Sequence, residues 1–223
     1  MPGDRINNRP YIVHGIAAAS PAPPHDASLH RIAHAMGDRF AFARGFVAHP
    51  AQVGSVVPSS TFLVQRLVRA ANLEQARTVV ELGPGTGGTT LALLHALRPD
   101  ARLLAIELSE AFHARLLDNI ADPRLAMQLG SAEQLAEYLR DWRLPAADVV
   151  LSGIPFSTMP VAVARRTAAA IAANLAAGGR FVAYQVRAHV AGFITPLLGA
   201  PTIGWEWRNV PPHRVFRWTK PGP

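Results

Sequence analysis

From residue 78 onward, short apolar runs alternate with longer stretches in which apolar residues recur every three or four positions. The short runs are typical of buried strands, and the longer stretches are typical of amphipathic helices. A strand–helix series of this kind folds into a mostly parallel sheet with helices on both faces. The predicted strands are 78–82, 102–107, 124–129, 147–151 and 180–186, and the predicted helices are 88–97, 110–120, 132–140, 160–176 and 188–198.

The C-terminal pattern differs, because two strand-like runs, 203–209 and 214–219, are separated only by a Pro-Pro step. Strands joined by a turn must pair antiparallel. The sequence therefore predicts an α/β fold: one Rossmann-like domain whose mostly parallel sheet is closed by an antiparallel C-terminal hairpin, preceded by an N-terminal helical extension.

Three segments of different character divide the chain. Residues 1–27 are rich in proline near their end and are expected to form a flexible tail. Residues 28–75 are expected to form a helical extension and lid, and residues 76–223 carry the predicted sheet. A length of 223 residues fits one such domain.

The helical periodicity of residues 29–47 has two interpretations. The apolar stripe can pack on the core of the domain. Alternatively, the helix can lie at a membrane surface, with Phe42 and Phe46, which flank the stripe, in contact with the lipid. Positive charge for such a contact comes from Arg31, Arg39 and Arg44. Both interpretations can hold, because the stripe and the two phenylalanines need not face the same way.

Composition narrows the function classes. No stretch reaches the about 18 consecutive apolar residues of a membrane span, and the absence of cysteine excludes disulfides and thiolate metal sites. The formal net charge is +7, carried almost entirely by arginine. Arginine binds phosphate and carboxylate in two-point contacts, so the charge indicates an anionic partner. A preference for Arg over Lys on ordinary surfaces is the alternative.

A glycine-rich loop follows the first predicted strand. Residues 81–87 read E-L-G-P-G-T-G, and the next strand ends on Glu107, twenty residues after Gly87. Glycines let the backbone approach a ligand closely, and an acid at the end of the second strand can accept hydrogen bonds from both ribose hydroxyls. The glycine order is not that of a dinucleotide site, and no P-loop lysine follows.

The E-L-G-P-G-T-G segment resembles motif I of class I S-adenosylmethionine (SAM) dependent methyltransferases. The resemblance implies SAM lying across the carboxyl ends of the strands, with its methionine part at the loop, its ribose at Glu107 and its adenine near Ser131 and Ala132. The residues expected to bind SAM are Pro58, Ser59, Glu81, Gly83, Pro84, Gly85, Gly87, Glu107, Leu108, Ser131 and Ala132.

A second motif, Ser-Gly-Ile-Pro-Phe at residues 152–156, ends the fourth predicted strand. It resembles the Asn/Asp/Ser-x-Pro-Tyr/Phe motif of amino-group methyltransferases. We therefore expect Ser152, Gly153, Pro155 and Phe156 to form the catalytic acceptor site. The carbonyls of a turn held by proline can accept hydrogen bonds from an amine, and Phe156 can cover its face. A plain strand-to-helix loop with a buried phenylalanine is the alternative.

Four segments together are similar to the bacterial phospholipid N-methyltransferases, a family related to ribosomal RNA adenine dimethyltransferases: 53–60, 81–87, 152–160 and 209–216. The resemblance covers residues 29–219. It implies successive methylation of phosphatidylethanolamine to phosphatidylcholine, or methylation of ornithine lipids, by a cytoplasmic enzyme held peripherally at the inner membrane. Residues 29–47 would then contact the anionic membrane.

The resemblance places His49 and His213 near the substrate, where either could relay a proton. Arg187 and Arg214, with Arg208 and Arg217, could form an anion site for a lipid phosphate, although edge strands commonly carry solvated charges. No metal site is expected, because the pair His30 and His34 lacks further ligands.

Two other functions fit the same motifs. Basic charge suits an RNA adenine dimethyltransferase-like enzyme. The 152–156 sequence departs from the Asn-Leu-Pro-Tyr form, however, and no C-terminal RNA-binding domain is expected. Nucleic acid is therefore not the expected partner. A SAM-binding protein without catalysis that docks on membranes is the other possibility.

Overall fold

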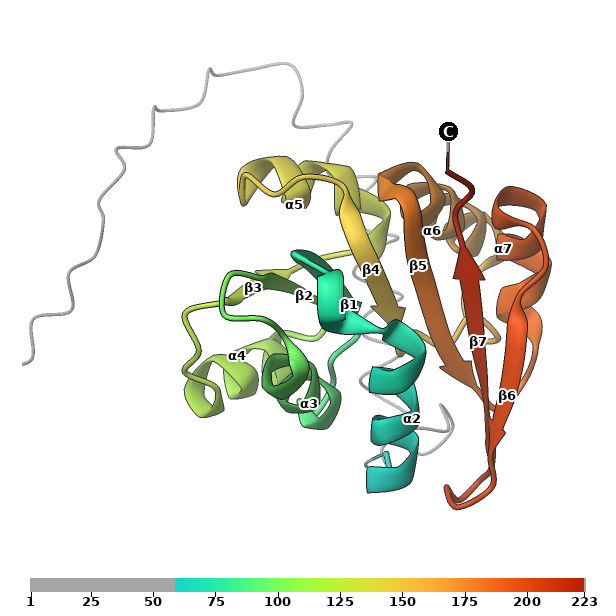
Figure 1. The fold of residues 1–223 in the computed structure, drawn as a ribbon, viewed down its shortest axis with the longest axis horizontal. Helices are drawn as coiled ribbons and strands as arrows, with labels where there is room; N and C mark the ends of the chain where they lie inside the picture. The colour runs from blue at the N-terminus through green and yellow to red at the C-terminus, as the bar shows by residue number, and fades with distance from the viewer. Residues whose placement is uncertain (1–58, 223) are drawn as a thin grey trace, which may run out of the picture. The chain divides into compact units, whose positions relative to one another are not determined.

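The computed structural model describes residues 59–222, which form a seven-stranded sheet with strand order β3-β2-β1-β4-β5-β7-β6 (Figure 1). The strands are β1 Thr78–Leu82, β2 Arg102–Glu107, β3 Leu125–Leu129, β4 Ala147–Ser152, β5 Leu175–Gln185, β6 Thr202–Glu206 and β7 His213–Thr219. The helices are α2 Thr61–Ala71, α3 Gly88–Ala96, α4 Glu110–Asn119, α5 Leu135–Asp141, α6 Val161–Asn174 and α7 His189–Leu198, with short 3-10 turns at Leu73–Gln75 and Ala132–Gln134.

The first five strands are parallel, and the last two close the sheet. Strand β1 lies at the centre between β2 and β4, and β5 extends the parallel set beyond β4. Strand β7 pairs antiparallel with both β5 and β6. The predicted α/β fold, a mostly parallel sheet closed by an antiparallel hairpin, is confirmed.

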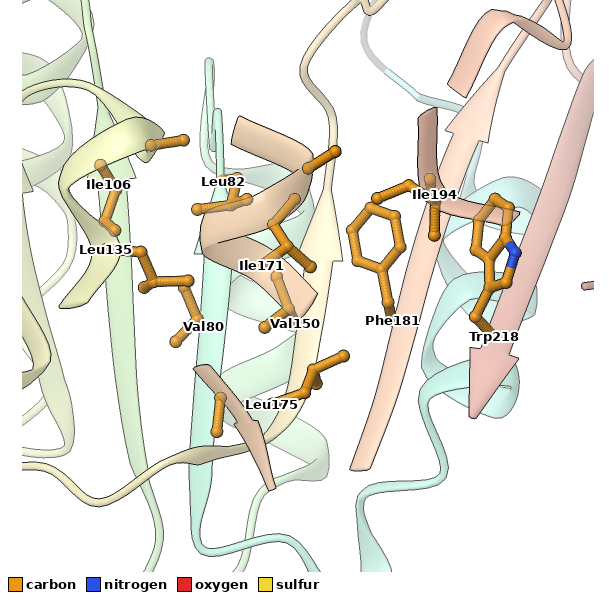
Figure 2. Close-up of a cluster of buried hydrophobic side chains, with 14 of the residues drawn as sticks. Val80, Leu82, Ile106, Leu135, Val150, Ile171, Leu175, Phe181, Ile194 and Trp218 are labelled. Carbon is orange, nitrogen blue, oxygen red and sulfur yellow. The ribbon is translucent and has the colours of Figure 1, made fainter. Parts of the chain in front are cut away.

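Each face of the sheet buries its own apolar layer. On one face, strand residues such as Val80, Val150 and Phe181 pack against Leu135 of α5 and Ile171 of α6, as Figure 2 shows. On the other face, α2 and α3 cover a second cluster of buried residues. The strands read as continuous apolar runs because both of their faces are covered.

Helix α2 is fixed at its start by a hydroxyl cap. The Oγ atom of Ser60 accepts a hydrogen bond from the Leu63 amide, which satisfies one free donor of the first turn. Leu63, Leu67 and Ala71 are fully buried along one side of the helix. The helix packs against β5, β7 and α3.

The largest difference from the predicted boundaries is the start of β5, at Leu175 instead of residue 180. Ala147 of β4 pairs with Leu175, but Val149 pairs with Arg180, so β5 carries extra residues opposite β4. A Cβ added at Gly179 would lie 2.8 Å from the Ala176 carbonyl oxygen and 3.0 Å from that of Ala147. Gly178 and Gly179 therefore lie at an irregularity inside a longer strand.

No helix within residues 59–222 is long and apolar enough to cross a membrane.

Candidate active site

Backbone hydrogen bonds gather three loops at the carboxyl edge of the parallel strands. The Gly83 amide donates to the Ile106 carbonyl at the end of β2, and the Gly153 amide donates to the Leu82 carbonyl at the end of β1. The Gly130 amide, after β3, donates to the Glu107 carbonyl. Ligands of open α/β sheets bind at this edge. These three loops, which follow β1, β3 and β4, form the candidate site together with the loop after β2.

The loop after β1 needs glycine for two different reasons. Gly83, Gly85 and Gly87 have φ angles of 72°, 55° and 86°, a region that favours glycine. A Cβ on Gly87 would lie 2.5 Å from the Leu116 side chain of α4, whereas nothing lies within 4 Å of a Cβ on Gly85. Gly87 therefore permits helix packing, and Gly85 leaves open space beside the loop. The Pro84 carbonyl accepts from the Gly87 amide, 3.0 Å away, and closes the turn.

The carboxylate of Glu107 joins the loop after β1 to the loop after β2. One oxygen accepts from the Gly85 amide at 3.0 Å, and the other accepts from the amides of Leu108 at 2.8 Å and Ser109 at 2.9 Å. The residue is 5% exposed. Several amide donors stabilise an ionised carboxylate, so Glu107 places a negative charge where the sequence predicts the ribose contact.

Glu81 is a second carboxyl group at this edge, and it lies in the core. Its side chain is 1% exposed and accepts a hydrogen bond of 2.7 Å from the Thr90 hydroxyl of α3. Burial raises the pKa of Glu81 to about 7; the Thr90 hydrogen bond opposes this rise, and the charge of Glu107 adds to it. Glu81 can therefore gain or lose a proton near neutral pH.

Tyr184 of β5 is a site residue that the sequence reasoning missed. Its hydroxyl lies 2.7 Å from the position that a Cβ on Gly153 would take, so only glycine fits there. Burial raises the pKa of Tyr184, the charge of Glu81 raises it further, and hydrogen bonds with Thr89 and Ser59 oppose the rise. The only sequence signal was a pair of polar residues, Tyr184 and Gln185, at the carboxyl end of a strand whose preceding residues 181–183 are apolar.

The loop at residues 152–156 is held tightly against the sheet. The Ser152 hydroxyl accepts from the Ile154 amide at 3.3 Å, and the Gln185 side chain donates to the Ile154 carbonyl at 2.8 Å. Pro155 begins a turn in which its carbonyl accepts from the Thr158 amide. Gln185 was also missed by the sequence reasoning.

Phe156 lies in the core, 2% exposed, with its ring centroid 6.0 Å from that of Phe193 of α7. This burial matches the alternative expectation of a strand-to-helix loop with a buried phenylalanine. A contact between Phe156 and an amine stays a prediction, and it requires the ring or its neighbours to move.

His213 lies beside this part of the site. Its ring centroid is 6.1 Å from that of Tyr184, and its Nδ1 atom is 2.8 Å from the Pro211 carbonyl oxygen and 3.0 Å from the Asn209 side-chain nitrogen. The Asn209 side-chain oxygen accepts from the Ser60 amide at 2.8 Å. Asn209 thus joins the terminal hairpin to the start of α2.

The four arginines that could form one anion site do not all lie together. Arg214 and Arg217 lie on opposite faces of β7, since side chains alternate along a strand. Arg208 pairs with Glu206 at 2.9 Å, and Arg187 is exposed after β5. Arg217 instead lines a cavity of about 260 Å³ beside α2. Arg217 therefore lies apart from Arg214. The Arg214 guanidinium lies 3.5 Å from the carbonyl oxygen of Val186, the residue before Arg187, so substrate binding by Arg187 and Arg214 stays a prediction.

The adenine contact predicted at Ser131 and Ala132 lies at the same edge, directly after β3. The Ser131 hydroxyl accepts from the Glu133 amide and caps a short 3-10 turn, and Ala132 is 7% exposed. The remaining predicted contacts, Phe42, Phe46, His49 and Pro58, lie outside the described residues, as does the predicted helix 29–47.

Comparison with known proteins identifies the family. The chain is 31% identical over 183 residues to an ornithine lipid N-methyltransferase from Singulisphaera acidiphila, covering 81% of this chain and 95% of that protein. The chain belongs to the bacterial phospholipid N-methyltransferase family. It is a SAM-dependent N-methyltransferase. No protein-family model matches the chain.

Two further comparisons give a second related methyltransferase and a solved structure of the same fold. A ribosomal RNA small subunit methyltransferase A from Nocardia farcinica is 32% identical over 183 residues, which cover 74% of this chain and 61% of that protein. The N-methyltransferase NodS from Bradyrhizobium japonicum, solved with S-adenosylhomocysteine, has the same fold, with a TM-score of 0.60 at 14% identity over 79% of this chain and 98% of NodS.

The site of this N-methyltransferase fits SAM. The open space beside Gly85 and the carboxylate of Glu107 suit a nucleoside, because the ribose hydroxyls are donors and the loop carries no side chain at that point. The buried acid Glu81 lies at the start of the same loop, where a positively charged amino acid group is expected to bind.

Glu107→Ala is expected to weaken binding of S-adenosylhomocysteine by about ten- to a hundredfold, because it removes charge-assisted hydrogen bonds. Calorimetric titration measures the change. Glu110→Ala is the matched control, since Glu110 is an exposed acid three residues further along. Equal affinities for wild type and Glu107→Ala would contradict the assignment.

Glu81 is expected to make folding stability depend on pH. Its pKa is raised on folding, so its contribution is fully present below pH 4.5 and is lost as the pH rises through about 7. The free energy of unfolding should fall by about 3 kcal/mol across that window, while Glu81→Gln, which can keep the Thr90 contact, should lack this fall. The neighbouring groups Glu107 and Tyr184 are the same in the wild type and in Glu81→Gln, so the difference between the two pH profiles comes from Glu81. Urea unfolding between pH 4 and 8 tests this, and identical pH profiles would contradict it.

Proposed function

We propose that this N-methyltransferase transfers the methyl group of SAM to the primary amine of a membrane-lipid head group. The observation that carries the proposal is the contact between two loops: a Cβ on Gly153 would lie 2.9 Å from the Gly83 carbonyl oxygen. The loop at residues 152–156, which we call the acceptor loop, therefore touches the glycine-rich loop at residues 83–87. The similarity to an ornithine lipid N-methyltransferase supports a lipid as the acceptor.

The acceptor nitrogen must be neutral to attack, because a protonated amine has no free electron pair. SAM supplies a methyl group bonded to a positively charged sulfur. The chain has to supply a place for the amine proton, and two of its groups suit this role. The Tyr184 hydroxyl lies against Gly153 of the acceptor loop, and Glu81, in electrostatic contact with Tyr184, has a pKa of about 7.

We propose that Tyr184 receives a hydrogen bond from the amine and that Glu81 takes the released proton. This role replaces the contact with the methionine part of SAM that the sequence predicts for Glu81. The rest of the loop keeps this geometry rigid. Gln185 binds the Ile154 carbonyl, and the Gly153 amide is bonded to β1. Holding the nucleophile against a rigid loop reduces the entropic part of the activation barrier.

Two head groups fit the proposal. An ornithine head group carries a primary amine and a carboxylate, and phosphatidylethanolamine carries a primary amine and a phosphodiester. Arginine binds either anion. The relative from Singulisphaera acidiphila favours ornithine lipid as the acceptor. Phosphatidylethanolamine, the acceptor expected from the sequence, is the second candidate.

Incubation with radiolabelled SAM in three parallel reactions tests the acceptor. The reactions contain vesicles with ornithine lipid, vesicles with phosphatidylethanolamine, and ribosomal RNA. We expect label in a lipid and none in RNA, with the ornithine lipid labelled faster. Label that enters RNA alone would contradict the proposal and favour the dimethyltransferase relatives.

Tyr184→Phe is expected to slow lipid methylation by about a hundredfold or more, because it removes the hydroxyl that binds the amine while keeping the ring beside His213. Affinity for S-adenosylhomocysteine should stay unchanged. The variant should recover part of its rate as the pH rises and the amine loses its proton to solvent. A rate equal to that of the wild type, or a parallel loss of cofactor affinity, would exclude this role.

A further inference from the structure

Large apolar side chains are exposed beside the edge of the sheet that carries the site. In the turn between β6 and β7, Trp207 is 67% exposed and Val210 is 82% exposed. In the first turn of α2, Phe62 is 42% exposed. The Asn209 side chain binds the Ser60 amide, so the hairpin turn and the start of α2 are neighbours. We call Phe62, Trp207 and Val210 the apolar rim.

The strand register places the apolar rim at the mouth of the site. Gln185, the last residue of β5, pairs with Arg214, and Glu206, the last residue of β6, pairs with His213. The turn of the hairpin therefore lies at the carboxyl edge of the parallel strands. In Figure 1 it extends beyond the arrowheads of β4 and β5.

Aromatic rings at and beside the rim carry guanidinium groups on their faces. The Arg208 guanidinium carbon lies 4.1 Å from the centre of the Phe62 ring, and that of Arg214 lies 4.5 Å from the centre of the Trp205 ring. Trp205 in turn stacks on Trp207, with centroids 4.8 Å apart and planes 9° apart. The exposed indole is therefore held in a fixed orientation and does not pack into the core.

Exposed tryptophan beside arginine is the side-chain combination that the boundary between water and lipid accepts. The indole is amphipathic and prefers the head-group region, while arginine can bury its stem and keep its charge among phosphates. The net charge of +7 favours an anionic surface over a neutral one.

We propose that the apolar rim inserts into the head-group region of an anionic lipid bilayer and holds the carboxyl edge of the sheet against the membrane. This surface is formed by residues within 59–222, other than those of the helix predicted at residues 29–47. The inference rests on the proposed function in one respect: the acceptor amine lies in the same bilayer, so the rim would bring the acceptor loop to its substrate.

Vesicle flotation with the full chain tests the rim by binding alone. The vesicles contain phosphatidylglycerol and phosphatidylcholine, neither of which offers a primary amine. Trp207→Ala and Val210→Asp are each expected to weaken binding by about tenfold. Val210→Asp adds a negative charge at a highly exposed position, so it is a second variant in case Trp207→Ala disturbs the stacked pair.

Trp142→Ala is the matched control. Trp142 is an exposed tryptophan, 39% accessible, directly after α5 and before the amino end of β4, at the opposite edge of the sheet. It should bind vesicles as the wild type does. Unchanged affinity for S-adenosylhomocysteine in all three variants shows that the fold is intact.

Vesicle binding that is unchanged in both rim variants would overturn the inference, and so would an equal loss in Trp142→Ala. Loss of binding to single-stranded RNA in the rim variants, with vesicle binding unaffected, would assign the rim to nucleic acid and also overturn it. If the wild type floats through the rim yet methylates neither amino lipid, the proposed function fails and the inference stands.

Discussion

The site depends on one carboxylate bound to three backbone amides. Glu107, at the end of β2, accepts hydrogen bonds from Gly85 in the loop after β1 and from its own two successors, Leu108 and Ser109. Two loops from adjacent strands are thereby held together by a charged group that is nearly buried. A carboxylate bound in this way has its charge fixed in place before any ligand arrives, which is the form of preorganisation that binding and catalysis favour.

The central position of β1 allows this arrangement. Because β2 and β4 flank β1 in parallel register, the glycine-rich loop after β1 touches the loop at residues 152–156, and Gly83 and Gly153 are small enough for their backbones to meet. The antiparallel hairpin then adds β7 next to β5. It brings His213 beside Tyr184 and places exposed aromatic residues at the same edge. Cofactor, acceptor and membrane contacts can therefore share one edge of a single sheet.

Local signals in the sequence predicted the fold and the glycine-rich turn after β1, because both depend on neighbouring residues. Apolar runs marked the strands, and glycines marked positions where φ is positive, such as Gly85. The start of β5 was misplaced because its glycines serve an irregularity that exists only when β4 lies alongside. Tyr184 and Gln185 were missed, since their roles come from β5 lying next to β4. Arg217 was grouped with Arg214 because the two are close in sequence, but residues three positions apart on β7 point to opposite faces of the sheet.

A crystal structure of the protein with S-adenosylhomocysteine tests the central claim most directly, namely that Glu107 and the Gly83–Gly87 loop hold the nucleoside beside the acceptor loop. The account predicts both ribose hydroxyls within hydrogen-bond distance of the Glu107 carboxylate, with the homocysteine part reaching toward Glu81 and Gly153. A nucleoside bound away from the carboxyl ends of β1 and β2, or ribose hydroxyls turned away from Glu107, would contradict the account.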